Sequence, residues 1–247
     1  MRSLLLAIGF LTTVPVRVND AAMSEVGRAA MWFPIIGFFM GLMLGAVHLV
    51  LLQFFAPLLA AALTVVLWIT FTGGLHLDGL ADCCDGLFVS ASPERRLEIM
   101  RDPRVGSFGA IGLVLIIALK ILAIGSTDFR SLQDFGSLLN FVLALTISRW
   151  LILIVAMQPQ ARAGGMGAEF ARGITRRTII IAAIVPILFV IACFISWQMI
   201  IPIIAAHAVT FLVIRFARAR IGGVTGDVIG LTVEVSEAII LIIFAVQ

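Results

Sequence analysis

Seven long apolar runs constrain this chain more than any other feature of its sequence. They cover residues 29–54, 57–76, 106–125, 138–157, 179–196, 198–214 and 227–246. A helix rises about 1.5 Å per residue, so each run is close to the length that crosses a hydrocarbon core of about 30 Å. Only 13% of the residues are charged, against about 25% in soluble domains. The pattern predicts an all-α polytopic membrane protein, a single integral-membrane domain over residues 1–247, and excludes a soluble domain or a nucleic-acid binder.

The ends of these runs predict the orientation of the chain. The apolar stretch 4–15 is too short to span, and it predicts an N-terminal interfacial or re-entrant helix. Fourteen of the 17 basic residues fall in alternate connections, at 1–28, 77–105, 158–178 and 215–226. Connections rich in arginine stay in the cytoplasm. We therefore expect about seven transmembrane helices, a cytoplasmic N-terminus and insertion in the cytoplasmic (inner) membrane.

A first stripe of acidic residues follows the second apolar run. Asp78, Asp82 and Asp85 are spaced i, i+4 and i+7, which places them on one face of a helix. Three neighbouring carboxylates repel one another, and a cation between them relieves that repulsion. Oxygen ligands favour Mg²⁺, Mn²⁺ or Ca²⁺. The alternative is a solvated acidic helix end.

A second acidic stripe lies inside the last apolar run. Asp227, Glu234 and Glu237 share one helix face, and Gly230 between them allows another helix to approach closely. An ionised side chain at the centre of a bilayer costs roughly 2.5–3.5 kcal/mol on the insertion scale. The stripe must therefore face protein, water or metal, and intramembrane acids of this kind are candidate functional residues. A proton relay is the main alternative.

Both stripes are expected on the cytoplasmic side, which predicts one site with one or two divalent ions. Mg²⁺ is the expected cofactor, because it uses a few carboxylates and leaves positions for substrate phosphates. The candidate metal ligands are Asp78, Asp82, Asp85, Asp227, Glu234 and Glu237. All of these except Glu237 are also candidate catalytic residues.

Basic residues near these stripes predict an anionic substrate. Arg101 and Arg104 precede Gly106 and Gly109 at the start of the third run, where arginine side chains and helix N-terminal amides can bind phosphate oxygens together. Within the fourth run, Arg149 is expected to pair with an acidic stripe or with a substrate phosphate. The remaining candidates are His76, two residues before Asp78, and the glycine-rich stretch 162–167, which is either a backbone cradle or an ordinary turn. Lys120 is interpreted as a snorkelling residue near the outer end of its span.

The two acidic motifs together resemble the cobalamin synthase family, adenosylcobinamide-GDP ribazoletransferase. The similarity extends from Leu11-Thr12-Thr13-Val14-Pro15-Val16 to the segments 33–37, 73–86 and 222–237. Segment 100–109 is similar to the family's "KDSRIGAFG" segment, with Arg101 in place of lysine and Pro103 in place of serine. The resemblance implies an integral membrane enzyme of the late cobalamin pathway. Such an enzyme joins adenosylcobinamide-GDP to α-ribazole or its 5′-phosphate, requires Mg²⁺ and releases GMP.

Two other functions are compatible with parts of the pattern. A CDP-alcohol phosphotransferase also uses an aspartate-rich signature, but Asp82 is followed by Cys83 and Cys84 where that signature has arginine. A cation- or proton-coupled transporter also carries intramembrane acids, yet the acids here gather at the cytoplasmic edge. We expect the two substrates and membrane lipid as partners, possible homo-oligomers, and an active site that faces the cytoplasm.

Overall fold

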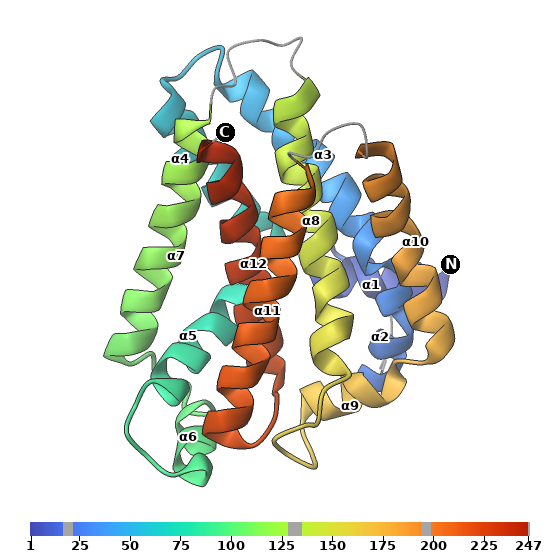
Figure 1. The fold of residues 1–247 in the computed structure, drawn as a ribbon, viewed down its shortest axis with the longest axis vertical. Coiled ribbons are helices and arrows are strands. Elements are labelled where there is room, and N and C mark those ends of the chain that lie inside the picture. Colours follow the sequence, from blue (N-terminus) through green and yellow to red (C-terminus); the bar gives the residue numbers. More distant parts are fainter. Residues whose placement is uncertain (17–21, 128–134, 194–198, 247) are drawn as a thin grey trace.

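Long apolar helices form the body of the structure (Figure 1). The computed structural model describes residues 1–16, 22–127, 135–193 and 199–246, and within them no strand is present. In chain order the elements are α1 Arg2–Leu11, α2 Met23–Ala29, a 3₁₀ turn Ala30–Trp32, α3 Phe33–Leu51, α4 Pro57–Thr72, α5 Leu75–Leu87, α6 Pro93–Ile99, α7 Ser107–Ser126, α8 Phe135–Ala156, α9 Met166–Gly173, α10 Arg176–Cys193, α11 Ile200–Ile221 and α12 Gly226–Val246.

Five helical segments are long and apolar enough to cross a membrane. They are Met23–Leu51, Ser107–Ser126, Leu138–Ala156, Ile200–Ile221 and Gly226–Val246. Two bent pairs, α4 with α5 and α9 with α10, raise the number to as many as seven if each pair is one span. The all-α class and the candidate membrane spans are therefore confirmed, whereas seven spans and a cytoplasmic N-terminus stay predictions. The stretch predicted as an N-terminal helix forms α1, and two of the arginines in the loops, Arg17 and Arg130, lie outside the described residues.

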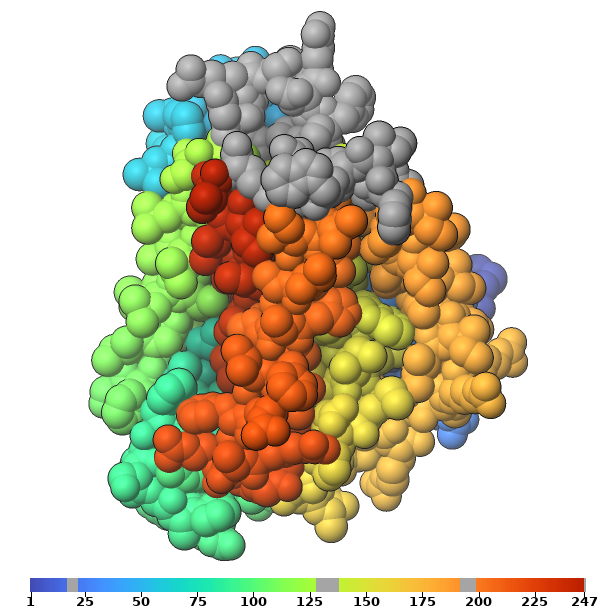
Figure 2. All heavy atoms as spheres, in the orientation of Figure 1, coloured from blue at the N-terminus to red at the C-terminus, as the bar shows by residue number. Residues whose placement is uncertain are grey.

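The arginine-rich connections that follow residue 77 gather at one end of the bundle, the lower end in Figure 1. This end carries α6, α9, the end of α11 and the first turns of α7 and α12, while the C-terminus lies at the opposite end. In the view of Figure 2, α11 covers the lower part of α12, whose C-terminal part reaches the surface. The positions of the connections agree with the alternation that the sequence predicts.

Small residues let α3 lie directly against α8. Gly37, Gly41 and Gly45 repeat every four residues along one face of α3. A Cβ atom on Gly41 would stand 2.5 Å from the Cα of Val142, and one on Gly45 would stand 3.0 Å from the side chain of Leu138. Stripes of this kind are typical of membrane helices, where close backbone packing replaces the hydrophobic effect. α8 is thereby held at the centre of the bundle.

A sharp bend between α4 and α5 directs the first acidic stripe. The two helices meet at 94°. Gly73 and Gly74 form the bend with φ angles of +66° and +69°, a region that glycine enters without the penalty that a Cβ imposes. The N–H of Thr13 donates to the carbonyl of Phe71 over 2.8 Å, so the chain after α1 caps the end of α4. The bend turns α5 away from the direction of α4.

We predict that Gly41→Ala destabilises the protein, because the new methyl group meets the backbone of α8. Overpacking of this kind costs about 1–3 kcal/mol, which lowers the apparent melting temperature by roughly 2–10 °C. Thermal unfolding of the purified protein in detergent measures the change. Gly9→Ala is the matched control, since its Cβ would lie 3.5 Å from Val16, an ordinary contact. Equal melting temperatures for the two variants would contradict the close packing of α3 on α8.

Candidate functional site

The two helices that carry the acidic stripes touch through glycine. A Cβ on Gly79 of α5 would stand 2.9 Å from the carbonyl oxygen of Asp227. A Cβ on Gly230 of α12 would stand 2.9 Å from the carbonyl oxygen of His76. The close approach predicted at Gly230 is therefore confirmed, and it brings Asp227 beside the first stripe.

Three aspartates, Asp78, Asp82 and Asp227, lie close enough at this contact for their charges to interact. Asp78 is exposed, Asp82 is half-buried, and the side chain of Asp227 is 27% exposed. Asp78 and Asp227 line a cavity of about 190 Å³ together with His76, whose Nε2 is buried without a hydrogen-bond partner. The negative charges of Asp78, Asp85 and Asp227 all act on Asp82. The arrangement concentrates negative charge beside a cavity, which is where a cation or a proton would be held.

The third acid of the first stripe has a different partner. The carboxylate of Asp85 accepts hydrogen bonds from the N–H groups of Gly106 at 2.7 Å and Gly109 at 2.9 Å. An acceptor at this position satisfies unpaired amides at the start of α7 and interacts favourably with the helix dipole. The sequence predicts that these glycine amides bind substrate phosphate; in the structure they donate to Asp85, and their role toward substrate stays a prediction.

The two arginines of the same loop are both exposed. Arg104 forms a bidentate pair with Asp102, with Nε–Oδ1 at 2.9 Å and Nη2–Oδ2 at 2.6 Å. Hydrogen bonds from Arg104 lower the pKa of Asp102 to about 2. Arg104 is thus engaged within its own loop. The charge of Arg101, by contrast, acts on Asp227, and this places Arg101 near the aspartates.

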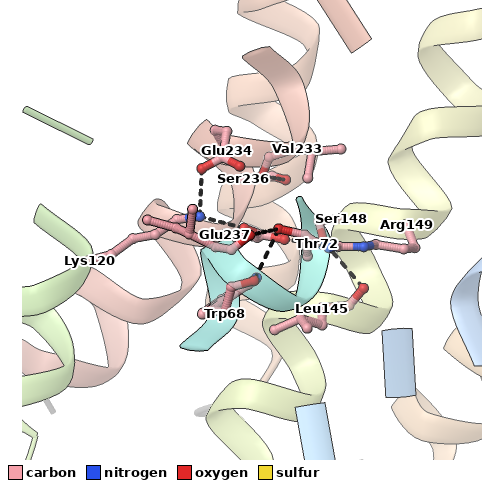
Figure 3. A network of polar contacts seen from close by, with 11 residues as sticks. Trp68, Thr72, Lys120, Leu145, Ser148, Arg149, Val233, Glu234, Ser236 and Glu237 are labelled. Carbon is pink, nitrogen blue, oxygen red and sulfur yellow. Dashed lines mark hydrogen bonds and ion pairs between the residues drawn. The ribbon is translucent and has the colours of Figure 1, made fainter. Parts of the chain in front are cut away.

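Glu234 and Glu237 lie in a buried network of ion pairs (Figure 3). Lys120 of α7 donates to Glu234 Oε2 over 2.6 Å and to Glu237 Oε2 over 2.5 Å. Its ammonium group also lies 4.6 Å from the centroid of the Trp68 ring, a cation–π contact. Arg149 of α8 binds the other oxygen of Glu237, and it donates to Ser148 Oγ over 2.7 Å.

The network corrects the interpretation of Lys120 as a snorkelling residue. The side chain of Lys120 is 6% exposed, so its ammonium group lies among protein groups and does not reach a membrane surface. The reason is that α7 packs on α12, where the two glutamates lie within reach of it. The expected pairing of Arg149 with an acidic stripe is confirmed by its contact with Glu237. Two positive and two negative side chains leave the network without net charge.

The six acids do not form a single cluster. Among the described residues, no group of three histidine, cysteine, aspartate or glutamate side chains is arranged to hold a metal ion. Asp227 and Glu237 share a helix face, but ten residues of helix separate them by about 15 Å. The structure therefore divides the predicted set into aspartates at the end of the bundle and glutamates inside it. The identities of the metal ligands and catalytic residues stay proposals.

A further buried arginine, which the sequence did not single out, fixes the end of the acidic helix. Arg96 of α6 is 5% exposed. It donates from Nη1 to the carbonyl of Leu87 over 2.6 Å and to that of Gly86 over 3.2 Å, and from Nε to that of Ala91 over 3.0 Å. These bonds satisfy carbonyls at the C-terminus of α5. In the sequence Arg96 could not be distinguished from its neighbour Arg95, which is exposed.

The chain matches the family model described as cobalamin-5-phosphate synthase over residues 3–245. It belongs to this family. Curated relatives named adenosylcobinamide-GDP ribazoletransferase include proteins from Chlorobium phaeobacteroides (36% identical, covering 97% of this chain and 96% of the relative) and Desulfitobacterium hafniense (35%, 98% and 96%). A third, from Escherichia coli, is 30% identical over 95% of this chain and 96% of the relative. No solved structure matches the chain. The resemblance seen in the sequence and the classification as a transferase are thus confirmed.

We predict that Lys120→Met destabilises this cobalamin synthase family member, since it leaves two buried carboxylates opposite a single arginine. Breaking a buried ion pair by removing one partner costs about 3–5 kcal/mol. Thermal unfolding in detergent measures the loss. Adding Glu234→Gln to Lys120→Met restores neutrality, and the double variant should regain part of the stability.

Arg95→Met is the control for that experiment. Arg95 pairs with Glu98 on the surface, where both side chains are more than half exposed and the pair contributes about 0–1 kcal/mol. If Lys120→Met and Arg95→Met unfold at the same temperature as the unaltered protein, the network does not stabilise the bundle.

Proposed function

We propose that this chain is a Mg²⁺-dependent membrane phosphotransferase. It joins adenosylcobinamide-GDP to α-ribazole, or to α-ribazole 5′-phosphate, and releases GMP. This is the last step in assembly of the nucleotide loop of cobalamin. One observation carries the proposal: in a chain of this family, Asp227 meets the aspartates of α5 beside a cavity at the arginine-rich end of the bundle.

The aspartates have the chemistry that Mg²⁺ requires. Carboxylate oxygens are its preferred protein ligands, and it usually takes one or two of them together with substrate phosphates. A site completed by substrate needs no cluster of three acids, which agrees with the separation of Asp78, Asp82 and Asp227 from the glutamates. We assign Mg²⁺ to one or two of these three aspartates. Asp85, Glu234 and Glu237 take positioning roles, because each already binds groups of the chain.

The reaction transfers the corrinoid-bearing phosphoryl group from GMP to the acceptor. An oxygen of the acceptor, either α-ribazole or α-ribazole 5′-phosphate, forms a new bond to the corrinoid-side phosphorus. The bond from that phosphorus to the oxygen of GMP breaks. When bound, Mg²⁺ neutralises the charge of the diphosphate oxygens. A carboxylate of the aspartate group accepts the proton of an attacking hydroxyl. Arg101 binds phosphate oxygens at the exposed rim, and His76 binds substrate in the cavity through its unpartnered Nε2.

The location of the reaction follows from the charge of its substrates. Diphosphates do not enter a hydrocarbon core, so the aspartates and Arg101 must open to water. We propose that this end of the bundle faces the cytoplasm, in the inner membrane, as the positive-inside rule predicts. Association into homo-oligomers and contact with lipid remain predictions.

We predict that Asp82→Asn and Asp227→Asn each reduce GMP release from adenosylcobinamide-GDP by about 100-fold or more, because general acid–base groups alone contribute about 10²–10⁴-fold. Both amides have nearly the size of the acids, so the variants should still insert and purify. Glu98→Gln is the matched control, since Glu98 is an exposed acid of the same end of the bundle. Full activity of either aspartate variant would refute the assignment.

Removal of divalent metal should also stop the reaction. Excess EDTA should abolish GMP release in detergent, and added Mg²⁺ should restore it. The same assay with α-ribazole and with α-ribazole 5′-phosphate identifies the acceptor. Turnover of a CDP-alcohol in place of adenosylcobinamide-GDP, or unchanged turnover in EDTA, would contradict the proposed function.

A further inference from the structure

Arg162 is the most unusual side chain near the site outside the buried network. It lies in the loop between α8 and α9, and its side chain is 19% exposed. Its Nε and Nη2 atoms are buried and have no hydrogen-bond partner. A guanidinium group carries five donors, and buried donors of a charged group are costly to leave unsatisfied. Such a group is suited to an anionic ligand.

Asp227 does not satisfy the buried hydrogen-bond donors of Arg162. The Nη2 atom lies 3.6 Å from Asp227 Oδ2, which is too long for a hydrogen bond. The same carboxylate oxygen accepts a hydrogen bond from Thr225 Oγ1 at 3.0 Å. Arg162 therefore forms a long ion pair with Asp227 but donates no hydrogen bond to it.

The backbone holds Arg162 in this place. The N–H of Ala161 donates to the carbonyl of Val224, and the N–H of Val224 donates to the carbonyl of Pro159, each over 2.9 Å. A Cβ on Gly223 would stand 2.5 Å from the oxygen of Pro159, so the two loops are in direct contact. The position of Arg162 relative to Asp227 is thus fixed by the connection that leads into α12.

Arg162 separates two cavities. One, of about 110 Å³, lies between the glycine-rich stretch 164–167 and residues 224–227, which lead into α12. The other is an open groove of about 730 Å³ between the end of α8, α9 and the start of α10. Gln160, Arg162 and Ala168 border both of them. The groove therefore leads past Arg162 to Asp227.

The lining of the groove matches a nucleotide. Arg172 and Arg176 are exposed along it, and Gln158 and Gln160 line it with side-chain amides that donate to backbone carbonyls. Apolar contacts come from Met157, Ala171, Ile174 and Ile179, and the described residues that line the groove include no acid. Its volume lies within the range of small-molecule sites, about 300–1,000 Å³. Phosphates would meet the arginines and a base would meet the apolar floor.

We propose that the groove between α8, α9 and α10 binds the nucleoside portion of a nucleoside diphosphate substrate, and that Arg162 binds its phosphates where the groove meets Asp227. This inference rests on the proposed function for the identity of the substrate. It assigns the leaving nucleotide to one side of the aspartates. The cavity beside Asp78 and His76, which Asp227 also lines, remains for the second substrate.

Binding of GMP to the full-length protein in detergent with Mg²⁺ tests the inference without requiring turnover. Arg162→Gln should weaken GMP binding about 10- to 100-fold, the range of a hydrogen bond to a charged group. Arg162→Lys should retain part of the affinity. The double variant Arg172→Gln/Arg176→Gln, altered only at exposed side chains, should also weaken GMP binding and raise the KM for adenosylcobinamide-GDP but not for α-ribazole.

Arg177→Gln is the matched control, because Arg177 is exposed on α10 next to Arg176 but does not line the groove. GMP affinity unchanged in Arg162→Gln, or no GMP binding by the unaltered protein, would overturn the inference. So would loss of binding to phosphatidylglycerol vesicles in the double variant with unchanged GMP affinity, which would make the groove a lipid site. GMP binding through Arg162 without turnover of adenosylcobinamide-GDP would refute the proposed function alone.

Discussion

Four buried charges set the geometry on which the rest of the molecule depends. Lys120, Arg149, Glu234 and Glu237 come from α7, α8 and α12, and they lie where an unpaired ion would be expensive. The charges of the four side chains neutralise one another only if the three helices keep one relative position. The register of α12 is therefore fixed deep in the bundle, by ions that are separate from the aspartates at its end.

The geometry of the site depends on that register of α12. α12 touches α5 at Gly79 and Gly230, so a fixed α12 places Asp227 beside Asp78 and Asp82. Arg96 holds the end of α5, and Asp85 joins α5 to the start of α7. Charged groups inside the bundle thus hold the helices together, and we propose that those at its end bind substrate. In the proposed function, this division allows a protein with few charges to carry out a polar reaction at the edge of a membrane.

Much of this organisation could be predicted from sequence. The apolar runs correspond to the long helices, both acidic stripes are helical, and Gly230 makes the close approach that its position suggests. The angular position of residues on a helix is readable from sequence because the period of the helix is fixed. Distance along the helix is equally fixed, and it shows why Glu237 lies too far from Asp227 to share an ion.

Partners across helices could not be predicted in the same way. Lys120 is the chain's single lysine and falls within an apolar run, which was a usable signal for an internal ion pair. Only the structure shows that the intramembrane acids lie opposite it. The capping of α7 by Asp85 depends on the bend at Gly73 and Gly74, and no local pattern specifies its direction. The unsatisfied donors of Arg162 likewise arise from the contact between two loops that are far apart in the sequence.

We propose that the aspartates hold the metal while the glutamates hold the bundle together. The most direct test of this proposal is a structure determined with Mn²⁺ in place of Mg²⁺ and with GMP, in which anomalous scattering locates the metal. We expect Mn²⁺ density against carboxylate oxygens of Asp78, Asp82 or Asp227, with Lys120 still bound to Glu234 and Glu237. Density between the glutamates, with Lys120 displaced, would contradict it.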